Sequence, residues 1–487
     1  MQREFLLNIL FLVAINLLIK PFFIFGIDLT VQNRLPEGDY GLYFTLLNFT
    51  YLFQILNDFG IQNFNNRYVS QHPQVLPKYF PNLLALKLLL SGVYLSLSLV
   101  AAWALAGYGR SELPLLLVLL FNQALAQGVL FLRSNISGLG FFRLDSVLST
   151  LDKLLMLVSC GLLLWVFPAG WLSVRSFALA QTLALALTAL VVALTLRSKI
   201  RLPLYPSWLG NWKTGRPALL ALFRKSLPYA LVILLMTAYT RLDAVLLERL
   251  LPDGRLHADV YASAYRLLDA ANMFGFLFAT LLLPMFARML KRGADLRPLV
   301  SGSFKLIWAG SVGLAVLVFF SRAELIELML PERASDYRSA TLGLLIWTFV
   351  PVSTTYIFST LLTADERLMQ MNRFFAVGIA LDVALNLWLI PQYQALGSAL
   401  ATLLTQTFIA LAMAGLCWRY YRFRPSVRGL GQVLGFTGFV SIGTALIFQK
   451  LAVVWPQRLA LSVSLLLAGA LLFRLLDFRP LRRMAEG

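Results

Sequence analysis

The chain has 487 residues, of which 59% are hydrophobic and 13% are charged, and its formal net charge is +19. Soluble domains carry about 25% charged residues, so this composition excludes a soluble globular protein and predicts that most of the chain lies in lipid. The positive charge does not indicate a nucleic-acid-binding protein, because the lysines and arginines stand in short clusters between apolar runs.

Apolar runs bounded by charge, proline and glycine predict about fourteen transmembrane helices. A hydrocarbon core of about 30 Å needs roughly 20 residues per helix, so these spans leave no room for a large soluble domain. In chain order we expect them at residues 5–30, 40–66, 79–106, 113–132, 144–167, 172–196, 226–250, 259–287, 300–321, 338–363, 371–391, 395–418, 428–449 and 457–476.

The distribution of lysine and arginine predicts the orientation of the chain. With the N-terminus in the cytoplasm, the segments on the inside carry 26 of these cations and the segments on the outside carry 9. Since loops rich in lysine and arginine stay on the cytoplasmic side, we expect both termini in the cytoplasm and an even number of spans.

The longest polar connection, residues 197–225, contains seven cations and no acid and lies near the middle of the chain. It also holds two tryptophans, so it is either a basic linker or an amphipathic segment on the inner leaflet, and the two interpretations are compatible. We expect one six-helix bundle before it, at 1–196, and another after it, at 226–418. Residues 419–487 would add helices thirteen and fourteen and a cytoplasmic tail.

The sequences before and after this linker contain similar short segments at a spacing of about 220 residues. Leu35–Gly38 reads Leu-Pro-Glu-Gly and Leu251–Gly254 reads Leu-Pro-Asp-Gly, and the Leu-Asp pair at 151–152 recurs at 381–382. Since each repeat would contain an even number of helices, both would enter the membrane with the same polarity. The predicted fold class is therefore all-α integral membrane, with two parallel-related six-helix bundles and two extra C-terminal helices.

Five segments together carry a likeness to a known family: Lys20-Pro21, Leu35–Tyr43, Asn57–Ile61, Leu381–Pro391 and Gly397–Thr402. They resemble Wzx-type polysaccharide flippases of the multidrug/oligosaccharidyl-lipid/polysaccharide (MOP) exporter superfamily, and the resemblance covers nearly the whole chain. One departure is Gln394, which stands where such proteins often have glycine.

This resemblance implies a MATE/MurJ-like fold and a transporter rather than an enzyme. The implied activity is movement of an undecaprenyl-diphosphate-linked oligosaccharide, such as an O-antigen, capsule or exopolysaccharide unit, from the inner to the outer leaflet of a bacterial inner membrane. The implied partners are that lipid-linked glycan, the membrane lipids and the polysaccharide polymerase machinery.

Three cations inside the predicted spans form the expected substrate-binding site. Lys20 and Arg241 each lie about 15 residues into a span that starts in the cytoplasm, which places both about 22 Å from the inner surface. Arg266 lies about 7 residues into span eight from the outside and reaches a similar depth. The three cations would therefore share one layer of the membrane. A diphosphate group could bind there, because a guanidinium binds phosphate oxygens bidentately and an ammonium acts as a point charge.

The alternative is that acids neutralise the two arginines in ion pairs that only hold helices together. Asp243 and Glu248 are the acids near Arg241, and Asp259 and Asp269 are those near Arg266. Asp269 lies three residues after Arg266, where an intrahelical pair forms easily.

Other acids inside the spans are expected to serve ion coupling or helix packing: Asp58, Asp152 and Asp382. Asp382 and Asn386 are one turn apart on one helix face, which fits either an Na⁺ site or a packing hydrogen bond, and we favour packing. The coupling ions considered are H⁺ and Na⁺. No bound cofactor or metal is expected, because the two cysteines and two histidines are scattered.

Two other functions compete with the flippase. A cation-coupled multidrug antiporter of the same superfamily would use acid-centred sites and about twelve spans. A membrane glycosyltransferase or polymerase would need acids or a metal on a sizeable outer loop, and the outer loops are short. A Walker-type phosphate loop is absent from the sequence, which argues against ATP hydrolysis by this chain.

Overall fold

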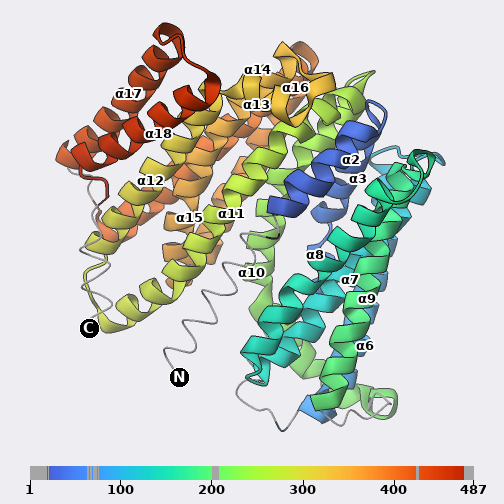
Figure 1. The fold of residues 1–487 in the computed structure, drawn as a ribbon. Helices are drawn as coiled ribbons and strands as arrows, with labels where there is room; N and C mark the ends of the chain where they lie inside the picture. The colour runs from blue at the N-terminus through green and yellow to red at the C-terminus, as the bar shows by residue number, and fades with distance from the viewer. Residues whose placement is uncertain are drawn as a thin grey trace. The chain divides into compact units, whose positions relative to one another are not determined.

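The computed structural model describes residues 19, 21–62, 65, 69, 74, 76–199, 208–423 and 427–476, with side chains left out at 78, 79, 142, 169, 208–226, 228 and 229. Every regular element in these ranges is a helix. The chain divides into two compact units, Met1–Arg249 and Leu250–Gly487, and each is considered by itself (Figure 1).

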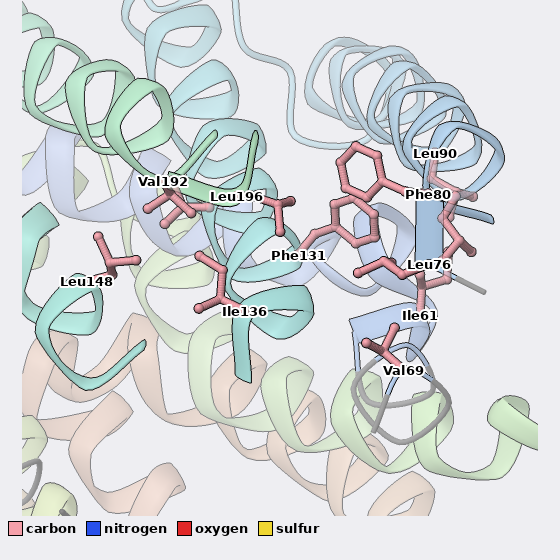
Figure 2. Close-up of a cluster of buried hydrophobic side chains, with 12 residues drawn as sticks. Ile61, Val69, Leu76, Phe80, Leu90, Phe131, Ile136, Leu148, Val192 and Leu196 are labelled. Atoms are coloured by element: carbon pink, nitrogen blue, oxygen red, sulfur yellow. The ribbon is translucent and has the colours of Figure 1, made fainter. Parts of the chain in front are cut away.

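The first unit is built around a group of long apolar helices. Its elements are η1 (Phe23–Asp28), α2 (Leu29–Arg34), α3 (Asp39–Leu52), α4 (Ile55–Asp58), α6 (Leu76–Ala104), α7 (Leu113–Gly138), α8 (Phe142–Trp165), η3 (Ala169–Trp171), α9 (Val174–Lys199) and α10 (Trp208–Leu250). Figure 2 shows buried side chains from α6, α7, α8 and α9 in one cluster, where the Phe80 and Phe131 rings stack with centroids 5.9 Å apart. Helix α9 packs against both α7 and α8.

The predicted span at 40–66 is not one continuous helix. Helix α3 ends at Leu52 and α4 ends at Asp58, where Phe59 and Gly60 both have positive φ angles of 45° and 80°. Glycine adopts this left-handed conformation without steric cost, which explains the break at Gly60. The polar residues at the end of α4 are thereby presented to α6 rather than carried on along one helix axis.

The second unit contains longer helices and ends in a hairpin. Its elements are α11 (Gly254–Arg292), α12 (Arg297–Phe320), α13 (Arg322–Met329), η4 (Pro331–Arg333), α14 (Asp336–Leu345), η5 (Ile346–Thr348), α15 (Phe349–Ala364), α16 (Leu368–Tyr421), α17 (Val427–Lys450) and α18 (Trp455–Leu472). Helix α11 packs against α14 and α15, and α12 packs against α15 and α17. The Ser335 hydroxyl caps α14 by accepting from the Arg338 N–H at 3.3 Å.

Helix α16 is a hairpin of two arms. Its 54 residues would extend about 81 Å as one straight helix, far beyond a 30 Å hydrocarbon core. The backbone reverses at Gln394, which has φ 55° and ψ −126°. The two ends of the element meet again, because the Tyr421 hydroxyl donates to Asp365 at 2.8 Å just before the first arm. This confirms the predicted separate spans at 371–391 and 395–418.

The bend leaves Gln394 in a backbone conformation that glycine adopts far more readily. We expect Gln394→Gly to raise the stability of the folded protein by about 1 kcal/mol, because relief of roughly 1–3 kcal/mol of strain outweighs the extra chain entropy of glycine. Thermal unfolding of the detergent-solubilised protein measures the change. Gln392→Gly, two residues earlier within the helix, is the control and should lower stability by about 1 kcal/mol; equal losses in both variants would contradict strain at Gln394.

The C-terminal hairpin of α17 and α18 lies against α12 (Figure 1). The Lys305 ammonium donates to the Gln432 side chain at 2.8 Å, and the Trp308 indole donates to the Thr437 hydroxyl at 3.0 Å. Gly313 of α12 leaves the space that a Leu466 methyl of α18 fills. These contacts hold the hairpin of α17 and α18 against α12.

Both units contain a matching tyrosine contact between helices distant in sequence. In the first unit the Gln181 amide of α9 donates to the Tyr43 hydroxyl of α3 at 2.9 Å. In the second unit the Tyr261 hydroxyl of α11 lies 3.0 Å from the Thr402 hydroxyl of α16. The two tyrosines are separated by about 220 positions, and so are Gln181 and Thr402. This is the spacing of the similar short segments in the sequence.

Eleven helices in the described ranges are long and apolar enough to cross a membrane, and α16 supplies two arms. The two predicted spans without a match are 40–66, which is broken, and 5–30, most of which lies outside the residues described. The count of about fourteen therefore stays a prediction. The predicted bundle boundaries also stay a prediction. The division into compact units places α10 in the first unit, whereas the sequence repeat places it in the second bundle.

Candidate functional site

Arg241 of α10 is partly buried and contacts two neutral side chains of α3. Its guanidinium donates to the Asn48 amide oxygen at 3.3 Å and lies 5.3 Å from the centroid of the Tyr51 ring. The Asn48 amide nitrogen donates to the Phe44 carbonyl at 2.8 Å, which turns the amide oxygen toward Arg241. An amide oxygen and a ring face both attract a guanidinium and help to orient it.

These contacts belong to a polar seam along which α3 and α10 run antiparallel. One turn from Asn48, the Thr45 hydroxyl donates to the Ala244 carbonyl at 3.3 Å. Moving forward along α3 from Thr45 to Asn48 corresponds to moving backward along α10 from Ala244 to Arg241. The seam therefore fixes the rotation of α10 that brings Arg241 to α3.

The two acids proposed to neutralise Arg241, Asp243 and Glu248, are both buried. Asp243 is 1% exposed and is two residues away, a spacing that directs side chains to different faces of a helix. Glu248 forms an ion pair with Arg249 at 2.7 Å. The described contacts place Arg241 beside Asn48 and Tyr51.

Arg266 of α11 is only 4% exposed. Of its two predicted acid partners, Asp259 accepts a hydrogen bond from Arg338 of α14 at 2.8 Å and lies 3.9 Å from Arg333. Asp269 is partly exposed and lies one turn along α11. Asp259 therefore interacts with at least two other arginines. Asp269 is the acid nearer to Arg266 in the sequence.

The predicted shared layer of three cations is not assembled in one described unit. Lys20 lies outside the residues described. Arg241 belongs to the first compact unit and Arg266 to the second. A joint site of Lys20, Arg241 and Arg266 therefore stays a prediction, with Arg241 and Arg266 both found inside long apolar helices.

Asp58, one of the acids considered for ion coupling, forms an ion pair with Lys87 of α6. The ammonium of Lys87 lies 3.2 Å from the Asp58 carboxylate and donates to the Asn57 carbonyl at 2.8 Å. Lys87 is 2% exposed, so it is buried between helices rather than extended to the membrane surface. The pair joins α4 to α6, directly before the break at Gly60.

Asp382 and Asn386 lie in the first arm of α16, and both are fully buried. The Asn386 amide nitrogen donates to the Asp382 carbonyl at 3.0 Å, the kind of bond that the packing interpretation requires. Asp152 lies 3.5 Å from its neighbour Lys153, whose ammonium is 5.5 Å from the Phe23 ring. Among the residues described, no group of three His, Cys, Asp or Glu side chains could hold a metal ion.

The sequence interpretation missed Asn48 and the partners of Asp259. A signal for Asn48 was present, because Thr45, Asn48 and Tyr51 recur every three residues along α3 and therefore share one face. A comparable signal for the Asp259 contact is missing, since its partner Arg338 is 79 positions away and in a different helix.

Residues 5–290 match the protein family described as "Polysaccharide biosynthesis protein". The search of curated proteins found no match.

Three solved structures share the fold. The lipid II flippase MurJ in an inward closed conformation is 13% identical, with a TM-score of 0.72 over 98% of this chain and 99% of that one. An inward-facing multidrug resistance MATE family transporter of the MOP superfamily is 14% identical, with a TM-score of 0.59 over 84% and 98% of the two chains. The Vibrio cholerae MATE transporter VcmN in the bent form is 15% identical, with a TM-score of 0.53 over 85% and 98%.

Identities this low establish the likeness of fold alone, whereas the family match covers more than half of the chain. The resemblance to Wzx-type flippases inferred from short motifs is thereby confirmed at the level of the family. The protein belongs to the polysaccharide biosynthesis protein family, has the helices of a multi-pass membrane protein, and shares its fold with a lipid II flippase and with transporters of the MOP superfamily.

Proposed function

We propose that this protein moves an undecaprenyl-diphosphate-linked oligosaccharide from the inner to the outer leaflet of a bacterial inner membrane by alternating access. The observation that carries the proposal is the presence of Arg241 and Arg266 inside long apolar helices of a polysaccharide biosynthesis family member. The similar fold of a lipid II flippase supports a lipid-linked substrate of this kind.

The chemistry of the carrier lipid suits these arginines. A charge near the bilayer centre costs roughly 2.5–3.5 kcal/mol on insertion scales, so buried arginines usually have a partner or a function. A diphosphate presents several anionic oxygens in a small volume, and a guanidinium binds two of them at once. Lys20 would add a third positive charge from the first span, acting as a point charge.

The charge asymmetry between the two sides supports the orientation of the protein. With 26 lysines and arginines in the segments on one side and 9 on the other, both termini would lie in the cytoplasm. The lipid-linked glycan would then enter from the leaflet where it is made. Membrane lipids and the polysaccharide polymerase machinery are the other partners in this proposal.

Coupling of transport to H⁺ or Na⁺ also belongs to the proposal. Buried acids in transporter helices are the usual sites of such coupling, and Asp382 with Asn386 provides fully buried oxygen atoms in α16. The protein would act without a bound cofactor, and the transporters that share its fold support a function other than catalysis.

A multidrug antiporter is the second function, because transporters described as multidrug resistance proteins share the fold. Such a protein would bind cationic drugs, for which acids rather than arginines are the complementary groups. The positions of Arg241 and Arg266 favour an anionic headgroup over a cationic drug.

The test is surface glycan display in cells that depend on this protein. We expect Arg266→Ala to reduce display about tenfold or more at normal expression, because each charge-assisted contact to a diphosphate contributes roughly 1.5–3 kcal/mol. The same variant should leave resistance to cationic drugs unchanged.

A paired variant separates substrate binding from an ion pair with Asp269. If Arg266 only neutralises Asp269, then Arg266→Ala combined with Asp269→Ala should restore display, since neither group is left unpaired. Normal display in the double variant at normal expression would remove Arg266 from the proposed substrate site. Persistent loss of display in the double variant is the result expected for a substrate ligand.

A further inference from the structure

The bend of helix α16 is held from outside by a contact that the proposed function does not use. The Ala395 N–H, directly after Gln394 with its positive φ, donates to the Tyr337 hydroxyl of α14 at 2.8 Å. The same hydroxyl lies 2.9 Å from Nδ1 of His257, in the first turn of α11. Three helices of the second unit therefore meet at one phenol oxygen. A backbone in the conformation of Gln394 persists only where its surroundings restrain it, so this contact helps to keep the bend in place.

The positions of the protons in this contact follow from its donors and acceptors. A backbone N–H can only donate, so the Tyr337 oxygen accepts from Ala395. The hydroxyl has one proton of its own, and Nδ1 of His257 lies within hydrogen-bond distance to accept it. Every proton of the contact has an acceptor when Nδ1 is unprotonated, and the neutral imidazole then carries its proton on Nε2. The contact therefore requires a neutral histidine.

A charged histidine is incompatible with the same arrangement. An imidazolium carries a proton on both ring nitrogens, so Nδ1 becomes a donor. The Tyr337 oxygen would then face two N–H donors, and its own proton would lose the acceptor that His257 provides. Because an unmade hydrogen bond at a partly buried site costs free energy, protonation of His257 weakens the restraint on Ala395.

His257 lies near the end of a helix that is longer than the membrane is thick. Helix α11 has 39 residues and therefore extends about 58 Å, against about 30 Å for the hydrocarbon core. His257 is partly exposed and precedes the predicted span at 259–287. The charge asymmetry of the loops predicts that this end of α11 lies on the outer side. Protons from that side therefore have access to His257.

Histidine is the residue at this contact that ordinarily titrates near pH 6. The other ionisable side chains within four residues of the three contact residues are Asp253, Arg255, Asp259, Tyr261, Arg333, Asp336, Arg338 and Tyr393. Aspartate ordinarily titrates near pH 4, and tyrosine and arginine at pH 10 or above. Residues 346–364 of η5 and α15, which also pack against α11, and residues 383–418 of α16 contain no charged residue. A change at the bend near pH 6 is therefore assigned to His257.

The direction of the pH effect follows from the pKa of His257. Burial lowers this pKa, and the negative charge of Asp253 opposes the change in part. The folded protein therefore favours the neutral form that the contact requires. Its contribution to stability is present above the ordinary histidine pKa of about 6.5 and is lost as the pH falls through the lowered value.

We propose that His257 is a proton-binding site on the outer side of the protein, and that protonation there releases the bend of α16 from α14. Such a site is independent of the substrate and goes beyond the proposed function. The two arms of α16 join at this bend, so a change in one contact reaches both arms. The outer end of the second unit would thus respond to the acidity of the compartment that it faces.

The experiment measures hydrogen exchange at the Ala395 amide in the purified full-length protein, at about pH 7.5 and about pH 5. Each rate is expressed as protection relative to an unstructured chain at the same pH, which removes the intrinsic pH dependence of exchange. We expect protection at Ala395 to fall about tenfold or more at the lower pH, while amides of residues 405–416 keep theirs. Unchanged protection at Ala395 would overturn the proposal, and so would an equal fall at 405–416, because that would show general loosening of the helix.

His257→Asn separates the proton from the hydrogen bond. The amide oxygen of asparagine can accept from the Tyr337 hydroxyl but does not take up a proton. Protection at Ala395 should therefore change by less than about twofold between the two pH values in this variant. His72→Gln, which removes the other histidine of the sequence, is the control and should keep the full pH dependence. A native fall in His257→Asn, or its loss in His72→Gln, would overturn the assignment to His257.

Tyr337→Phe provides a test that does not depend on the histidine variant folding. It keeps the ring but removes the oxygen that accepts from Ala395. The Ala395 amide should then be about tenfold less protected than in the native protein at the higher pH, with a change of less than about twofold on acidification. Native protection with native pH dependence in this variant would overturn the proposal, because the effect of the proton would not pass through the phenol oxygen.

Discussion

Gly397→Ala is expected to prevent the second unit from folding correctly, with a loss of about 3 kcal/mol or more and little protein recovered from the membrane. A Cβ at this position would lie inside contact distance of the Leu389 carbonyl oxygen, on the opposite arm of α16. Overpacking against a flexible side chain costs about 1–3 kcal/mol, and a backbone atom has less freedom to move aside. The yield of monodisperse protein after detergent extraction measures the effect.

Gly415→Ala is the matched control in the same element. A Cβ at Gly415 would meet nothing within 4 Å, and alanine favours a helix by about 1 kcal/mol over glycine. This variant should therefore be as stable as the native protein or slightly more so. Equal recovery of the Gly397 and Gly415 variants would contradict the close approach of the two arms.

Asp259→Ala is expected to destabilise the second unit by about 3–5 kcal/mol. Asp259 is fully buried, it binds Arg338 at 2.8 Å, and Arg338 is itself only 5% exposed. Removing one member of a buried ion pair leaves the other charged group desolvated without its counter-charge. The midpoint of thermal unfolding in detergent, compared with that of the native protein, measures the loss.

Two further variants test this explanation. Asp253→Ala removes an exposed acid just before α11 and should have little effect. Asp259→Leu combined with Arg338→Met should recover much of the lost stability, because apolar residues of similar volume replace a buried pair at little cost. A double variant as unstable as Asp259→Ala would indicate that Asp259 stabilises the unit through other groups.

The Asp259 contact also affects how the test of Arg266 is interpreted. Asp259 lies on α11 with Arg266, but Arg338 and Arg333 approach it from α14 and η4. Loss of display in an Asp259 variant would therefore reflect the stability of the unit as much as any effect on Arg266. Asp269, which is partly exposed, is the more informative partner to vary with Arg266.

The sequence by itself determined that the protein is an all-helical membrane protein and where most of its long apolar helices lie. A span of about 20 apolar residues is a local property, so spans such as 113–132 and 428–449 are found as helices α7 and α17. The split of α16 was also predictable, because proline, glutamine and glycine near residue 394 interrupt the apolar run. The break near Gly60 was not predicted, although Asn57, Asp58 and Gly60 interrupt the apolar run there.

Only the tertiary structure decided which faces of these helices meet. Lipid is as apolar as the protein interior, so hydrophobic periodicity does not separate the two environments in a membrane helix. Leu88 and Leu90 lie two residues apart in α6, yet they are 65% and 7% exposed. For the same reason the sequence placed Arg241 and Arg266 inside spans but did not identify the groups that they contact. The contact between Asn48 and Arg241, 193 positions apart, depends on the rotation and packing of α3 and α10, which no local pattern specifies.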